Sequence, residues 1–106
     1  MITQAVMIGG KLMTTATFTG PNTNITISSG TAGTITLSLS GVSGAGRISD
    51  YLGLLSITGL PAGVVVTGFE IDATKNEVTV FVYNTSGSDV TVTAGSVTAT
   101  AVVLAY

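Results

Sequence analysis

Residues that could carry out acid–base or metal chemistry are scarce in this chain of 106 residues. It has five carboxylates, three basic side chains, and neither histidine nor cysteine. The lack of imidazole excludes a Ser-His-Asp triad and a histidine zinc site. The lack of thiol excludes a cysteine nucleophile, a thiolate metal site and a disulfide. Only carboxylate chemistry remains, so we expect no enzymatic activity and no cofactor.

Glu70 and Asp72 are the carboxylates best placed to act as a pair. They lie two positions apart in an apolar run, which puts both side chains on one face of a strand. A Ca²⁺ ion takes about six to eight oxygen ligands, and only Asp89 and backbone groups remain to supply the others. We therefore interpret the pair as a solvated strand end beside a hairpin turn, where Lys75 and Glu77 add solubility.

A glycine-rich segment, residues 41–47, resembles a phosphate-binding loop with Arg47 as the clamp. Its glycine spacing is the reverse of the dinucleotide fingerprint, and no clear helix follows whose N-terminus could bind the anion. The pattern therefore favours a plain loop between strands.

The aromatic residues offer a third possibility, a stacking platform for sugars. The candidates are Tyr51, Phe69, Phe81, Tyr83 and Tyr106. Phe69, Phe81 and Tyr83 lie within alternating strand patterns, so core or cross-strand packing is the favoured interpretation.

The segments that position these residues have the pattern of consecutive antiparallel strands. β-branched residues alternate with polar ones, and Gly-rich or polar breaks recur about every eight to twelve residues. Strands are predicted at 12–19, 24–28, 34–40, 51–57, 64–71, 78–83, 90–92 and 96–104. The predicted fold is all-β: an antiparallel two-sheet β-sandwich, jelly-roll-like, with about eight strands.

Residues 48–57 are the ambiguous part of this pattern. Ser49 or Asp50 could cap a short helical turn, while Leu52, Leu54 and Leu55 also suit a strand. We favour a strand that begins near Tyr51.

The N-terminal residues 1–11 form either an extended arm or a first strand, and residues 12–106 a single β-sandwich domain. The segment is apolar up to Ile8 and is broken by Gly9-Gly10. It has no basic n-region, so no signal peptide is expected, and no run is long enough for a membrane helix. An arm would need a neighbouring subunit to cover its apolar side chains. In that case, replacing Val6 and Ile8 with Asp would weaken assembly and leave the fold intact.

The composition points to a protein that associates with other subunits. Charged residues are 8% of the chain, against about 25% in an average soluble domain. The net charge of −2 gives no attraction to nucleic acid or to an anionic membrane, so neither is an expected partner. A surface of Thr, Ser, Gly and aliphatic residues favours burial against other copies of the chain or against a larger protein assembly. The candidate interface residues are Val6, Met7, Ile8, Phe81 and Tyr83.

The last 45 residues or so carry a recognisable order of elements. Leu60-Pro61-Ala62-Gly63 opens an apolar strand and a polar turn; Val78-Thr79-Val80-Phe81-Val82-Tyr83-Asn84 and Thr85-Ser86-Gly87 precede a final alternating strand. This order resembles the small β-sandwich virion proteins of tailed bacteriophages, among them capsid cement or decoration proteins. The family often has Arg or Lys where this chain has Phe81, which makes this copy unusually apolar.

The resemblance implies a structural virion protein that forms a homotrimer, stabilises the phage head by bridging subunits of the major capsid protein, and carries no catalytic residue. The chain would be made in the host cytoplasm and lie on the capsid surface. Two alternatives remain. A tail or spike-proximal module that binds host glycans would be detected on a glycan array, and a subunit of an extracellular β-fibre or pilus would form filaments by strand exchange.

Overall fold

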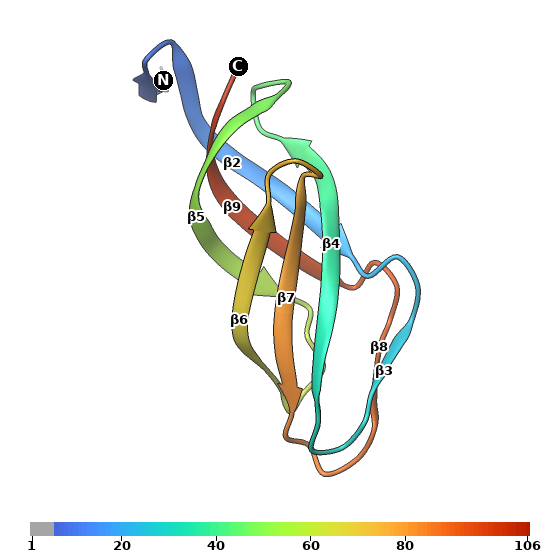
Figure 1. The fold of residues 1–106 in the computed structure, drawn as a ribbon. Helices are drawn as coiled ribbons and strands as arrows, with labels where there is room; N and C mark the ends of the chain where they lie inside the picture. The colour runs from blue at the N-terminus through green and yellow to red at the C-terminus, as the bar shows by residue number, and fades with distance from the viewer. Residues whose placement is uncertain (1–5) are drawn as a thin grey trace, which may run out of the picture.

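The computed structural model describes residues 6–106, and in this range the chain forms nine strands and no helix (Figure 1). The predicted all-β class is confirmed, with one strand more than the eight or so expected. None of the described residues belongs to a helix that could cross a membrane. The strands are β1 (Val6–Ile8), β2 (Lys11–Gly20), β3 (Ile25–Ile27), β4 (Ala32–Val42), β5 (Ile48–Thr58), β6 (Val64–Asp72), β7 (Glu77–Asn84), β8 (Val90–Val92) and β9 (Val97–Ala105).

Six strands form one large antiparallel sheet in the order β5-β9-β2-β4-β7-β6, and β1 pairs with the first residues of β2. The sheet bends where β2 meets β4, because these strands pair over only a short stretch and their register shifts between Thr17 and Phe18. It therefore folds into two layers, β5-β9-β2 and β4-β7-β6, whose strands cross in Figure 1. One cluster of buried side chains fills the space between the layers.

Strict alternation places the core residues. In β7, Val78, Val80 and Val82 are fully buried, and the residues between them face outward. In β9 every second residue from Val97 to Ala105 is buried. Three of these are alanines, and the bulkier Phe18 pairs with one of them, Ala99. Small side chains beside large ones fill the interior without voids.

β5 is a strand with a three-residue repeat instead of the usual two. Its register against β9 shifts three times, and each shift leaves one residue of β5 without a direct partner. The core-facing positions are consequently Ile48, Tyr51, Leu54 and Ile57, each paired with a buried residue of β9. Repeated β-bulges explain why this segment lacks the strict alternation of an ordinary strand and was ambiguous in the sequence. The strand prediction is confirmed, with a start three residues before Tyr51.

A small two-stranded sheet, β3 with β8, extends one end of the molecule. Asn84, at the end of β7, connects it to the main sheet and is completely buried. Its Nδ2 donates hydrogen bonds to the carbonyl oxygens of Ile27 (3.0 Å) and Ser88 (2.7 Å). Its Oδ1 accepts one from the backbone N–H of Ser86 (2.9 Å), so every polar atom of the side chain has a partner.

The large sheet does not close on itself. β5 and β6 are its two ends, and β6 pairs only with β7 among the described strands. The molecule is elongated, with extents of 49 × 32 × 20 Å and a radius of gyration of 15.4 Å. A compact domain of this length has a radius of gyration of about 13 Å. More of this chain therefore lies at the surface than in a compact sandwich.

Candidate functional site

β1 contains the N-terminal candidate interface residues. Val6, Met7 and Ile8 pair with Met13, Leu12 and Lys11 of β2, so the described part of the segment is a strand. Residues 1–5 of the suggested arm lie outside the described residues. Met7 and Ile8 are 57% and 47% exposed, which is unusual for side chains of this size. β1 therefore presents an apolar surface to solvent.

Phe81 and Tyr83 lie on the outer face of β7. Phe81 is half-buried, between its cross-strand partners Thr34 on β4 and Gly68 on β6. Tyr83 is exposed, and its hydroxyl donates a hydrogen bond to the carbonyl oxygen of Gly30 (2.8 Å). Cross-strand packing is thus the role of these rings, and neither belongs to the buried core. The strands β2 and β4 separate them from β1, so the candidates form two surfaces instead of one.

The exposed apolar residues of β6 and β5 were not predicted as interface residues. Val65, Val66 and Phe69 of β6 are between 42% and 47% exposed, and Leu52 and Leu55 of β5 are more exposed still. Of the two roles expected for Phe69, it has the cross-strand one, beside Val80 of β7; it is not in the buried core, because β6 ends the sheet and no described strand covers it. Three consecutive valines without alternation at 64–66 predict a strand but do not distinguish a buried strand from an exposed edge strand.

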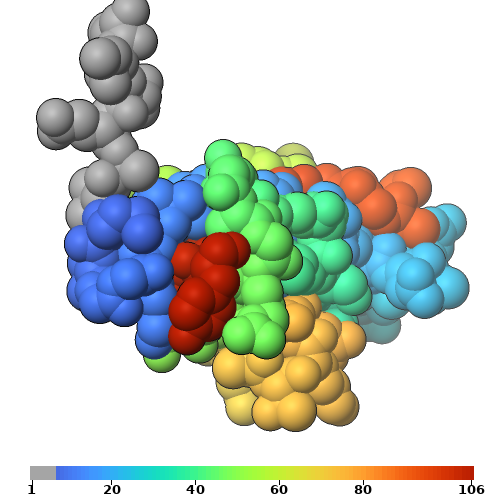
Figure 2. Space-filling view, turned by 90° about the horizontal axis from the view of Figure 1, so that it is seen from above, coloured from blue at the N-terminus to red at the C-terminus, as the bar shows by residue number. Residues whose placement is uncertain are grey.

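A small charged cluster lies where the C-terminal Tyr106 meets the start of β2 and the start of β5. Lys11 Nζ is 3.1 Å from Asp50 Oδ2, and the side chains of Lys11 and Arg47 lie over the ring of Tyr106. The Ser49 hydroxyl and Lys11 both hold the pKa of Asp50 below its usual value, and the hydrogen bond to Asp50 raises the pKa of Lys11. Figure 2 shows this C-terminal end between the β1–β2 hairpin and the loop before β5.

The glycine-rich loop of residues 41–47 has two of its amide groups in hydrogen bonds with the rest of the chain. The N–H of Ser43 donates to the carbonyl oxygen of Thr15, and the N–H of Gly46 donates to that of Tyr106. A phosphate-binding loop needs such N–H groups free and pointing at the anion. The loop instead joins β4 to β5 and fixes the C-terminal residue.

Two carboxylates of the 70–89 region, Asp72 and Asp89, also have structural partners. Asp72 Oδ1 accepts hydrogen bonds from the N–H groups of Thr74 and Lys75, which forms the turn between β6 and β7. Asp89 Oδ1 accepts one from the N–H of Ser29, on the other side of the small sheet. Within residues 6–106 no three acidic side chains come together in a metal-binding group.

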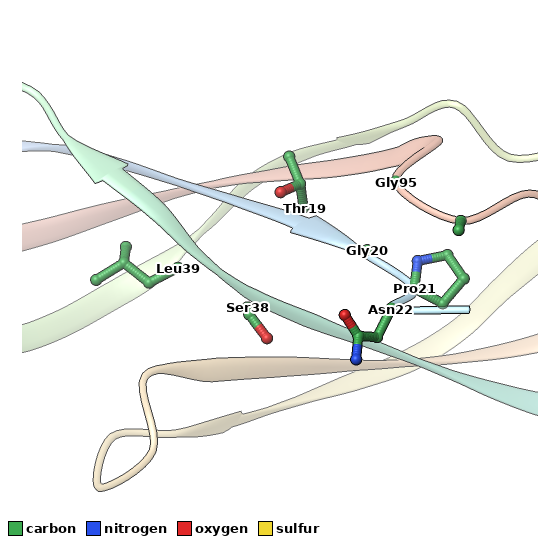
Figure 3. A pocket seen from close by; sticks show the side chains of 8 residues that line it. Thr19, Gly20, Pro21, Asn22, Ser38, Leu39 and Gly95 are labelled. Atoms are coloured by element: carbon green, nitrogen blue, oxygen red, sulfur yellow. The ribbon is translucent and has the colours of Figure 1, made fainter.

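One hollow of the described surface lies at the bend between β2 and β4 (Figure 3). It has a volume of about 430 Å³, with Pro21 and Asn22 on one side and Ser38 and Leu39 on the other. Its polar groups are hydroxyls, an amide and backbone atoms, and no charged or aromatic side chain lines it. The hollow therefore has neither an acid–base group nor a stacking surface for a sugar.

Comparison of the chain with protein-family models, with curated proteins and with solved structures found no match. The candidate site is therefore argued from the sequence and structure of this chain. The feature that stands out is the exposed apolar surface of β1, β5 and β6.

Proposed function

We propose that this protein is a structural subunit that associates with copies of itself on the surface of a virion, as a capsid cement or decoration protein. One observation carries the proposal: large apolar side chains are exposed on β1, β5 and β6 of a chain with only 8% charged residues. Surfaces of this kind mark contact sites in soluble proteins. The proposed location on a virion and the proposed homotrimeric state come from the resemblance of the C-terminal half to small phage virion proteins.

Burial of these side chains would favour assembly strongly. A standard interface takes about 800 Å² from each partner. That is about one seventh of the 5927 Å² surface of this chain. A repeating shell of the major capsid protein would then present many equivalent sites, so that weak contacts of each subunit add up across a trimer.

The mass in solution is the first test. Light scattering over a wide range of concentrations should give three times the chain mass of 10.5 kDa for a single trimer, or six times that mass where two trimers pair. The double variant Met7→Asp/Ile8→Asp should lower that mass and leave the circular dichroism spectrum unchanged, because both side chains are exposed. A native protein that stays monomeric at every concentration would contradict the proposal.

The location on a particle needs a separate test. Immunogold labelling of purified phage from a culture that carries the gene should decorate the heads. Label on tail tips only would favour the glycan-binding alternative, and labelled filaments without particles would favour the fibre.

A further inference from the structure

β6 has a free edge that is open along its length. The strand pairs with β7 on one side, and no described strand pairs with it on the other. β5, at the opposite end of the sheet, is also unpaired on one side, but its three bulges interrupt the ladder about every third residue. Bulges, prolines and lysines are the devices that protect edge strands. β6 has one bulge and no proline or lysine between Val64 and Asp72, and its two charged residues, Glu70 and Asp72, both lie at one end.

Side chains on the core side of β6 remain uncovered. Val66 is in register with Val82, and Phe69 with Val80, and both partners are fully buried. Val66 and Phe69 themselves are 42% and 47% exposed. The core layer therefore stops one strand short of covering them, and a further strand next to β6 would bury both.

The order of core-facing and outward-facing residues along β6 is the same from either end of the strand. The bulge at Thr67 lies in the middle, so core-facing residues occur at Val64 and Val66 before it and at Phe69 and Ile71 after it. A two-fold interface requires this self-complementarity, because the same patch must fit its own copy. In an antiparallel pair centred on the bulge, Val66 lies opposite Phe69 of the second copy.

The charges of β6 favour the same orientation. Glu70 and Asp72 lie at one end, and the other end, Val64 to Val66, is uncharged. Parallel pairing would bring the acidic ends of two copies together, which is unfavourable. Antiparallel pairing places each acidic end beside the valines of the other copy.

We propose that β6 is a self-association edge, at which two copies of this chain pair antiparallel about a two-fold axis near Thr67. The contact joins the β4-β7-β6 layers of two copies into one continuous sheet. The inference rests on the proposed self-association of the chain, but it does not require that the chain lies on a virion. It uses a different surface from β1, so a trimer can contain both contacts only by doubling to six copies.

Cysteine cross-linking tests the axis directly, because the native chain contains no cysteine. A disulfide requires Cα atoms about 4.4–6.8 Å apart. Thr67→Cys should therefore form a covalent dimer under mild oxidation, since the two copies of residue 67 lie beside the axis. Glu70→Cys should not, because its two copies lie about 17 Å apart along the strands. Equal cross-linking of both variants would indicate parallel pairing or random collision and would overturn the proposal.

A matched pair of lysine variants tests the edge itself. Val66→Lys places a charge on the free edge, and Thr36→Lys places the same charge on the exposed face of β4 inside the sheet. By light scattering, the native protein and Thr36→Lys should contain two copies if the edge contact acts alone, or six if the trimer also forms. Val66→Lys should contain one copy in the first case and three in the second. An unchanged mass for Val66→Lys would refute the edge contact. A trimer in every variant would refute it and leave the proposed function standing, whereas a monomer in every variant would refute both.

Discussion

Asn84 provides the sharpest test of the reasoning about the core. It is the buried polar residue of the described chain, and its three hydrogen bonds connect β7 to the end of β3 and to the following turn. Replacing it with alanine removes all three bonds. Each such bond contributes about 1 kcal/mol to stability, and a partner left buried without a bond adds about 1–3 kcal/mol.

The carbonyl oxygen of Ile27 would be the costly partner, because Ile27 is almost fully buried, whereas Ser86 and Ser88 are exposed and can bind water. We therefore expect Asn84→Ala to lower the free energy of unfolding by about 4 kcal/mol. The free energy of unfolding of a whole domain is about 5–15 kcal/mol, so the variant should still fold in water.

Urea unfolding followed by circular dichroism measures the loss. With a slope of about 1.5 kcal/mol per molar, the midpoint should fall by about 2.7 M. Asn24→Ala is the control, because Asn24 Oδ1 accepts one exposed hydrogen bond from the N–H of Ala94 (2.8 Å). Its cost should be about 1 kcal/mol or less. Equal losses for the two variants would refute the view that burial of Asn84 makes its bonds valuable.

Asn84→Asp adds a second measurement with the same side-chain shape. An ionised carboxylate cannot donate to the carbonyl oxygens of Ile27 and Ser88, and burial beside them disfavours its charge. The folded protein would therefore raise the pKa of the new carboxyl, so the variant should become more stable, relative to the native protein, as the pH falls from 7 to 4. A loss that does not change with pH would contradict this account.

Two further predictions follow from local geometry and charge. Gly59→Ala should cost several kcal/mol in urea unfolding, because Gly59 has a φ of +91° and a Cβ there would overlap the backbone before β9. Gly87→Ala, with a φ of +83° and open space around it, should cost only about 1 kcal/mol; equal costs would count against the clash. Asp50, whose pKa the Ser49 hydroxyl and Lys11 lower, should make the native protein more stable than Asp50→Asn above its ordinary pKa of 3.8. Thermal unfolding should show that difference disappearing as the pH falls through the lowered value, and a difference that persists at pH 2 would refute it.

The sequence predicted the class and the strands well, because one face of nearly every strand is buried. The strand predicted at 78–83 is β7, Glu77–Asn84, and the short strand at 90–92 is β8. In both strands the core-side positions are valines, and in β8 the residue between them is polar. The glycine-rich loop begins slightly later than expected, since β4 continues to Val42.

The surface residues were harder to predict, because exposure depends on which strand ends the sheet. The pattern of Val64 to Ile71 predicts a strand equally well in the middle of a sheet and at its edge. The order β5-β9-β2-β4-β7-β6 is set by contacts between distant segments, and single-strand periodicity contains no information about it. Asn84 was missed for the same reason: its partners lie on a strand 57 residues away and in the adjoining turn.

The bulges of β5 also have a mechanical consequence for the whole molecule. Eleven residues of β5, Ile48–Thr58, run alongside only eight of β9, from Thr98 to Ala105. Two hydrogen-bonded strands of unequal length cannot both stay straight, and the longer strand must lie on the outer side of a curve. The curvature of the β5-β9-β2 layer is thus partly encoded as extra residues in a single strand.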